Sequence, residues 1–220
     1  MQVKILIISS MALVCGLAHA APFTTPARIP GTKHLYRGAQ PIGHPDVLTK
    51  SGIDVVVIFK NDTKGEVKRE KDELTAEGTK RMRPFVVHHI PMEWKQIDSK
   101  RACEQTIQAL TVLLAAEKAG ANAYVHCTAG EDRTGMVSGL ARMLLNGETT
   151  DKIFADELCE NGYSDGGGKP SSVTKAIEAG LTPLFFTLAR KIESGVLTAK
   201  NISLKACEGV SLVGEKKSCH

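Results

Sequence analysis

The chain has 220 residues, of which 42% are hydrophobic and 24% are charged, so it can bury the core of one domain and is not disordered by composition. Its formal net charge of +4 is too small for a dedicated nucleic-acid binder. No apolar run beyond the N-terminus reaches the roughly 18 residues of a membrane-spanning helix, and six cysteines are too few for a disulfide-dense scaffold.

The first twenty residues have the three parts of a secretory signal peptide. Lys4 gives a short positive region, Ile5–Leu17 is mostly apolar, and Ala18-His19-Ala20 is an A-x-A cleavage site. A membrane anchor is the alternative, but the apolar stretch is short for a bilayer span. We predict that segment 1–20 is removed and that the mature protein is periplasmic or secreted.

The remainder, 21–220, is predicted to be a single domain with a core over about 35–195 and an irregular tail over 196–220. Residues 22–34 are rich in proline and read as irregular. Runs of β-branched residues predict strands, and apolar residues at helical spacing predict helices. The predicted strands are 53–59, 85–90 and 123–126, and the predicted helices are 65–77, 99–118, 133–145, 151–160 and 173–193. This alternation predicts an α/β fold with a central, mostly parallel sheet flanked by helices.

One segment carries the expected chemistry: His126-Cys-Thr-Ala-Gly-Glu-Asp-Arg-Thr-Gly135. It lies between a predicted strand and a predicted helix, where backbone N–H groups and a helix N-terminus favour a bound anion. A cysteine there should have a lowered pKa and be a thiolate at neutral pH. Arg133 can reach back across the opening and bind two phosphate oxygens. A buried cysteine is usually only a small hydrophobic residue, but the combination of motif and context favours a phosphate-binding loop.

The segment matches the pattern HCxAGxxRTG and resembles the phosphate-binding loop of the protein tyrosine phosphatase superfamily. The similarity is closest to compact, dual-specificity-like and bacterial members. Tyr36-Arg-Gly-Ala-Gln-Pro41 and His89-Ile-Pro-Met92 are similar to segments of such members and extend the resemblance to about half the chain. The low-molecular-weight phosphatases also use Cys-x5-Arg, but they carry it directly after their first strand.

The resemblance implies a two-step phosphoryl transfer in which Cys127 attacks phosphorus. Arg133 and the loop amides would hold the equatorial oxygens, and the Thr134 hydroxyl would help the sulfur to leave. The residues expected to bind the substrate are those of the loop: His126, Thr128, Ala129, Gly130, Glu131, Asp132 and Thr134. No metal and no cofactor is expected, since the sequence shows no ligand cluster. We expect a monomer that binds a phosphorylated small molecule or phosphoprotein, and neither nucleic acid nor membrane.

A carboxylic acid must protonate the leaving oxygen. In the family it lies about thirty residues before the cysteine, and Asp98 lies 29 residues before Cys127. We favour Asp98, although an aspartate there could simply stabilise the start of a helix. Glu93 and Asp132 remain alternatives.

The substrate class is less determined. Lipid-directed family members often carry lysine at the position of Glu131, and a negative residue there disfavours a second phosphate nearby. A basic stretch between the first two strands could attract polyanions, but interleaved acidic residues favour a solvated helix face; its members are Lys60, Lys64, Lys68, Arg69, Lys71, Lys80, Arg81 and Arg83. We favour inositol polyphosphates, as in the exported phytase-like branch, over phosphotyrosine proteins. A catalytically dead phosphate-binding module is a remote alternative.

Removal of the leader takes Cys15 and leaves five cysteines. An exported protein usually pairs its cysteines, and an odd number leaves one thiol free. We favour a Cys207–Cys219 bridge, which closes a short loop, with Cys103–Cys159 as the second pair. Buried reduced thiols are the alternative.

Overall fold

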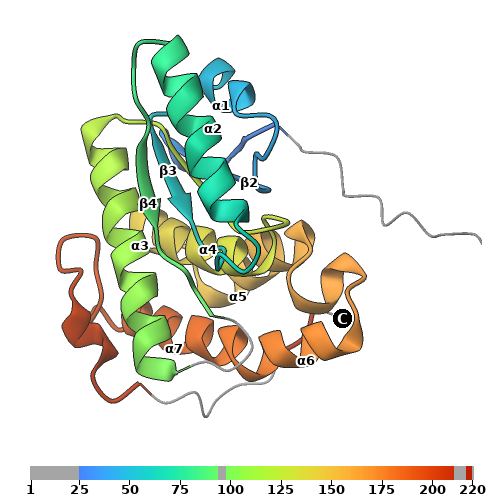
Figure 1. Ribbon diagram of the computed structural model, residues 1–220. Helices are drawn as coiled ribbons and strands as arrows, with labels where there is room; N and C mark the ends of the chain where they lie inside the picture. Colours follow the sequence, from blue (N-terminus) through green and yellow to red (C-terminus); the bar gives the residue numbers. More distant parts are fainter. Residues whose placement is uncertain (1–24, 94–97, 211–216, 220) are drawn as a thin grey trace, which may run out of the picture.

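The computed structural model describes residues 25–93, 98–210 and 217–219, so the predicted signal peptide lies outside the described residues. Its centre is a five-stranded sheet in the order β1-β2-β5-β3-β4 (Figure 1). Only the β1–β2 pair is antiparallel, which confirms the predicted mostly parallel sheet. The strands are β1 (Ala27–Arg28), β2 (Leu35–Gly38), β3 (Val55–Ile58), β4 (Val86–His89) and β5 (Ala123–His126).

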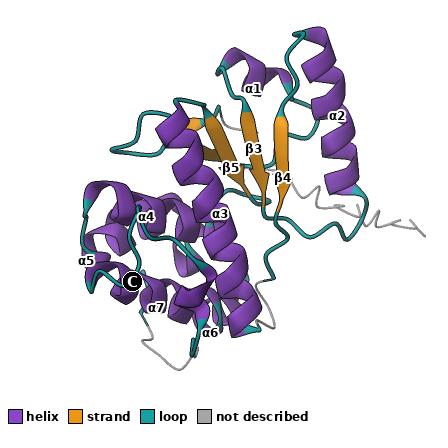
Figure 2. Ribbon diagram, turned by 90° about the vertical axis from the view of Figure 1, so that its left-hand side faces the viewer, coloured by secondary structure: helices purple, strands orange, loops and turns teal. Residues whose placement is uncertain are grey.

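Helices cover both faces of the sheet (Figure 2). They are α1 (Asp46–Lys50), α2 (Glu66–Lys80), α3 (Ser99–Ala119), α4 (Asp132–Asn146), α5 (Thr150–Ile153), α6 (Ser171–Ala179) and α7 (Leu181–Glu193). A π-helical turn (Phe154–Leu158) and three short 3-10 turns (Cys159–Asn161, Ser164–Gly167, Leu204–Cys207) complete the described elements.

Side-chain alternation along the strands divides the core into two layers. Val56, Ile58 and Tyr124 point to the side of α1 and α2, where they pack with Leu48 and Leu74. Val57 and Val125 point to the other side and join the larger core formed with α3, α4 and α7. Because the central strands β3 and β5 are buried on both faces, they are mostly apolar, as parallel strands usually are.

The predicted helix over 173–193 is interrupted, and α6 and α7 meet at Gly180. Pro183 explains the break, because proline has no N–H for the carbonyl four residues earlier and its ring clashes with that carbonyl. The predicted helix over 151–160 is helical throughout but passes from α5 into the π-helical and 3-10 turns. Strand β2 and helix α1 were not predicted, since four or five residues are too few to show a period.

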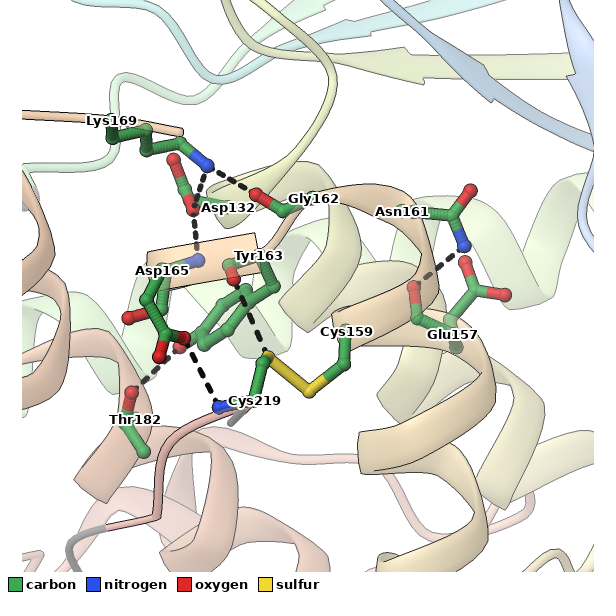
Figure 3. Close-up of a disulfide and its surroundings, with 11 residues drawn as sticks. Asp132, Glu157, Cys159, Asn161, Gly162, Tyr163, Asp165, Lys169, Thr182 and Cys219 are labelled. Atoms are coloured by element: carbon green, nitrogen blue, oxygen red, sulfur yellow. Dashed lines mark hydrogen bonds and ion pairs between the residues drawn. A yellow bond between two sulfur atoms is a disulfide. The ribbon is translucent and has the colours of Figure 1, made fainter. Parts of the chain in front are cut away.

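The favoured disulfide pairing is wrong. The bridges are Cys103–Cys207 and Cys159–Cys219, with Cα–Cα distances of 5.6 and 5.3 Å. Cys207 is buried against α3, which carries Cys103, whereas Cys219 lies beside the turn that follows the π-helical segment (Figure 3). The two tail cysteines therefore face different parts of the core. Cys127 is the free cysteine among the described residues.

No described helix is both long enough and apolar enough to cross a bilayer. The described parts of the tail are attached to the core through the two disulfides, at Cys207 and at Cys219.

Candidate active site

A tight loop joins the C-terminal end of β5 to the N-terminus of α4 and carries the sequence motif. Because β5 lies between β2 and β3, the loop opens at the middle of the sheet edge, where ligands of parallel α/β sheets usually bind. Gly130 has φ of +80°, and a Cβ there would lie 2.3 Å from the carbonyl oxygen of Gly38. Only glycine allows the loop to approach β2 this closely.

Cys127 follows β5 directly and is 4% exposed. Burial alone would raise the pKa of its thiol, but the charge of Arg133, the Thr134 hydroxyl and the backbone N–H groups of Thr134 and Gly130 outweigh it. The net result is a pKa below the ordinary value for cysteine. The site therefore favours the thiolate, which is the nucleophilic form.

Arg133 lies in the first turn of α4, 8% exposed. Its Nη1 donates to the carbonyl oxygens of Phe59, 3.0 Å away, and Met92, 3.2 Å away. These carbonyls follow β3 and β4, so the ends of two neighbouring strands fix one side of the guanidinium. The other N–H groups hydrogen-bond to no described residue, which leaves them for an oxyanion in the loop.

Strand β2 and the residues that follow it support the phosphate loop through two hydrogen bonds. Arg37 Nη2 donates to the Gly130 carbonyl at 2.6 Å, and the Gln40 backbone N–H donates to the Thr128 carbonyl at 3.0 Å. These two contacts fix the loop carbonyls of Gly130 and Thr128 to β2 and the residues that follow it. Both supporting residues belong to the Tyr36–Pro41 segment, whose roles the sequence left unresolved.

A buried ion-pair network holds Arg37 itself. Its Nη1 lies 2.5 Å from Glu157 Oε1, and the other oxygen of Glu157 pairs with Arg142 Nη1 at 3.0 Å. Arg142 in turn pairs with Glu148 at 2.7 Å. Glu157 is 1% exposed, and two guanidinium groups compensate its buried charge.

Lys169, from the 162–170 segment, pairs with the acidic residues of the loop, and Figure 3 shows its contacts with Asp132 and Gly162. Lys169 Nζ lies 2.7 Å from Glu131 Oε2 and 3.3 Å from Asp132 Oδ1, and it also donates to the Gly162 carbonyl. The Ser164 N–H donates to Asp132 at 2.9 Å. Burial raises the pKa of Asp132 above its ordinary value, although Lys169 and this N–H oppose the shift.

The other predicted loop residues differ in exposure. Thr128 and Ala129 are exposed, whereas His126 and Thr134 are fully buried. His126 lies behind the loop, and its Nδ1 is 2.9 Å from the Cys127 carbonyl oxygen.

Among the described residues, no contact joins the predicted acid, Asp98, to the phosphate loop. Asp98 is exposed and caps α3, its carboxylate accepting the Arg101 N–H at 3.0 Å, which is the helix-stabilising role named as its alternative. The chain leading to it contacts the site, because Met92 bonds to Arg133. Glu93 is also exposed and accepts from Asn61 Nδ2 at 2.8 Å.

Much of the basic stretch is paired with acidic neighbours. The pairs are Lys68–Asp72, Arg69–Glu73, Lys80–Glu77 and Arg83–Asp54. Lys60 pairs with Glu66 at 3.2 Å and also donates to Gln40 Oε1, in the segment that supports the loop, at 3.1 Å. The interleaved, solvated helix face is thus the better description of this stretch.

Sequence reasoning did not find Glu70, Glu157 or Lys169. Glu70 left a signal, because it occupies the apolar phase of α2 between the buried Val67 and Leu74, where a charge is unexpected. Among the described residues no three histidine, cysteine or carboxylate side chains are grouped as a metal site would require.

Comparisons with known proteins agree with this geometry. A family model described as "Tyrosine phosphatase family" matches residues 32–182. No curated protein sequence matches the chain. Among solved structures, a mutant form of Tk-PTP is 19% identical with a TM-score of 0.52, over 78% of this chain and 96% of that one. PTPMT1 is 14% identical with a TM-score of 0.50, over 80% and 99%. At these identities the structures show a shared fold alone.

Proposed function

The chain belongs to the tyrosine phosphatase family and is therefore a phosphoric monoester hydrolase, and from this premise we propose that Cys127 is its nucleophile and Arg133 its phosphate-binding residue. The observation that supports the proposal most is the buried thiol, whose pKa is lowered by Arg133, Thr134 and loop N–H groups. The same groups would surround a phosphate bound against the sulfur.

The proposed reaction has two steps. The Cys127 sulfur bonds to phosphorus as the P–O bond to the leaving group breaks, and Asp98 gives its proton to the departing oxygen. A water, deprotonated by the same carboxylate, then attacks phosphorus, and the S–P bond breaks to give inorganic phosphate. The Thr134 hydroxyl stabilises the thiolate as it leaves.

For the substrate we propose inositol polyphosphates. The position after Gly130 is negative, which alone would repel a second phosphate. Lys169 pairs with both Glu131 and Asp132, so it brings a cation to the loop and reduces that repulsion. Phosphotyrosine proteins are the second candidate, favoured by the description of the matching family model.

Phosphate release from phytate and from a phosphotyrosine peptide, measured side by side, separates the two classes. We expect kcat/KM for phytate to exceed that for the peptide by about threefold to fivefold, since one exposed charge contact contributes up to about 1 kcal/mol. Lys169→Met should reduce this preference, because it removes the cation and leaves two carboxylates. A preference for the peptide would assign the protein substrate instead. No turnover of any phosphomonoester, with phosphate binding intact, would support the dead-module alternative.

We also propose that the protein is exported. The signal-like segment 1–20 and the two disulfides support this, since disulfides persist in oxidising compartments. N-terminal sequencing of protein recovered from the periplasm or medium should begin at Ala21. A chain that keeps Met1 and stays in the cytoplasm would contradict the proposal.

A further inference from the structure

A buried pair of side chains lies behind the nucleophile. His126 is 0% exposed and Glu70, from α2, is 1% exposed. The ring Nδ1 is 2.9 Å from the Cys127 carbonyl oxygen, and Nε2 is 2.7 Å from Glu70 Oε1. The Cys127 carbonyl oxygen only accepts, so Nδ1 carries the ring hydrogen that bonds to it. Neither Nε2 nor Glu70 Oε1 is hydrogen-bonded to a described residue, so their 2.7 Å contact is that of a buried ion pair. The geometry therefore fits an imidazolium.

The Glu70 carboxyl group is held in place from its other side. Its Oε2 accepts from Gln40 Nε2 at 2.8 Å, and Gln40 Oε1 accepts from Lys60 Nζ at 3.1 Å. Lys60 also pairs with Glu66 at 3.2 Å. One carboxylate oxygen of Glu70 is thus hydrogen-bonded to Gln40, and the other lies against the His126 ring. The chain of contacts leads back to the loop, because the Gln40 N–H donates to the Thr128 carbonyl.

We propose that Glu70 is a positioning residue for the phosphatase reaction: it keeps His126 doubly protonated, and the imidazolium fixes the Cys127 carbonyl and favours the thiolate. The inference rests on the proposed role of Cys127 as the nucleophile. It extends the functional unit to a helix that lies outside the signature loop.

The other charged groups around the pair do not replace Glu70. Burial by itself lowers the pKa of His126, and Glu70, with the bond to the Cys127 carbonyl, raises it above the ordinary value. Tyr124 stacks on the ring with centroids 5.5 Å apart, but burial raises the pKa of its phenol, so it is neutral. Arg133 and Thr134 act on the Cys127 sulfur and are not among the groups that shift the pKa of His126.

A purely structural role for Glu70 would not explain why a carboxyl group is buried at this position. Replacing a buried ion pair with apolar residues of similar size is often neutral or stabilising. Glu70 lies on the apolar stripe of α2, where leucine would pack without desolvating a carboxylate. If Glu70 helps to keep the Cys127 thiol ionised, its buried carboxyl group has a functional reason.

The test is the pH dependence of Cys127 alkylation by iodoacetamide, followed by mass spectrometry of the peptide that contains Cys127. In Glu70→Gln the amide can donate to a neutral Nε2, so the shape is kept while the charge is lost. We expect the alkylation midpoint to rise by about one pH unit. The matched control is Glu77→Gln on the same helix, 8% exposed, which should leave the midpoint unchanged. A double variant with His126→Asn should shift it no further than His126→Asn alone.

An unchanged midpoint in a folded Glu70→Gln protein would overturn the inference. So would nitrogen NMR of the wild-type protein at pH 7 showing Nε2 of His126 without hydrogen, a measurement that holds even if the variant does not fold. Alkylation does not depend on turnover, so it is separate from the proposed function. That function would fail instead if a Cys127 variant remained active.

Discussion

Replacement of Cys127 by serine should abolish phosphate release, by about 10⁴-fold or more, while fold and phosphate binding remain. The serine hydroxyl stays protonated where the thiol is ionised, so no S–P bond can form. The loop amides and Arg133 do not change, because Arg133 is fixed by the carbonyls of Phe59 and Met92 rather than by the sulfur. Release of p-nitrophenol from its phosphate, with phosphate binding by calorimetry, measures both properties.

Thermal unfolding is the control for this variant, and the melting temperature should change little. The wild-type pH profile gives a second check. Because the pKa of Cys127 is below its ordinary value, kcat/KM should stay high at neutral pH and decrease as the pH falls through that lowered pKa. A Cys127→Ser variant as active as the wild-type protein would show that Cys127 is not the nucleophile.

Loss of the general acid should give the second largest effect, about 10²- to 10⁴-fold. We expect it from Asp98→Asn, a substitution that keeps the cap of α3, since asparagine caps helices as well as aspartate does. The reduction should be large for an alkyl phosphate, whose leaving oxygen needs a proton. It should be small for p-nitrophenyl phosphate, whose leaving group is stable as an anion. Comparing kcat for the two substrates measures the effect.

Asp132→Asn is the parallel variant. Asp132 has a raised pKa, as an acid should, but its Oδ1 already accepts the Ser164 N–H, and asparagine can keep that bond. We therefore expect only a modest loss with equal effect on both substrates. If Asp98→Asn keeps full activity while Asp132→Asn shows the leaving-group dependence, the role of acid belongs to Asp132.

The order of strands and helices around the loop was predictable because its signal is local. The apolar run of β5, the small residues of the loop and the helix after Arg133 are contiguous in sequence. Phosphate-binding chemistry needs just such an arrangement, a strand end followed by a helix N-terminus. The predicted helix 99–118 likewise matches α3, because a capping residue and a terminal glycine mark its ends.

The supporting residues were not predictable, because their partners are distant in sequence. Arg37 meets the Gly130 carbonyl across 93 positions, and no local pattern specifies which loop carbonyl an arginine will reach. Lys169 meets Glu131 only because the 162–170 segment folds over the start of α4. The disulfide pairing failed for the same reason, since it depends on where the tail packs. The Cys207–Cys219 bridge was predicted only from the short distance between the two cysteines in the sequence, which says nothing about where the tail packs.

The arrangement of the two disulfides has a consequence for biogenesis. Each bridge joins an early cysteine to a late one, 104 and 60 residues apart. If the chain is exported as proposed, Cys103, Cys127 and Cys159 emerge from the translocon before either correct partner. Oxidation at that stage would join two of these three thiols, and two of the three possible pairings would consume the Cys127 thiol needed for catalysis. We expect productive maturation to require thiol–disulfide exchange, and therefore an isomerase, so that Cys127 is returned to its reduced state.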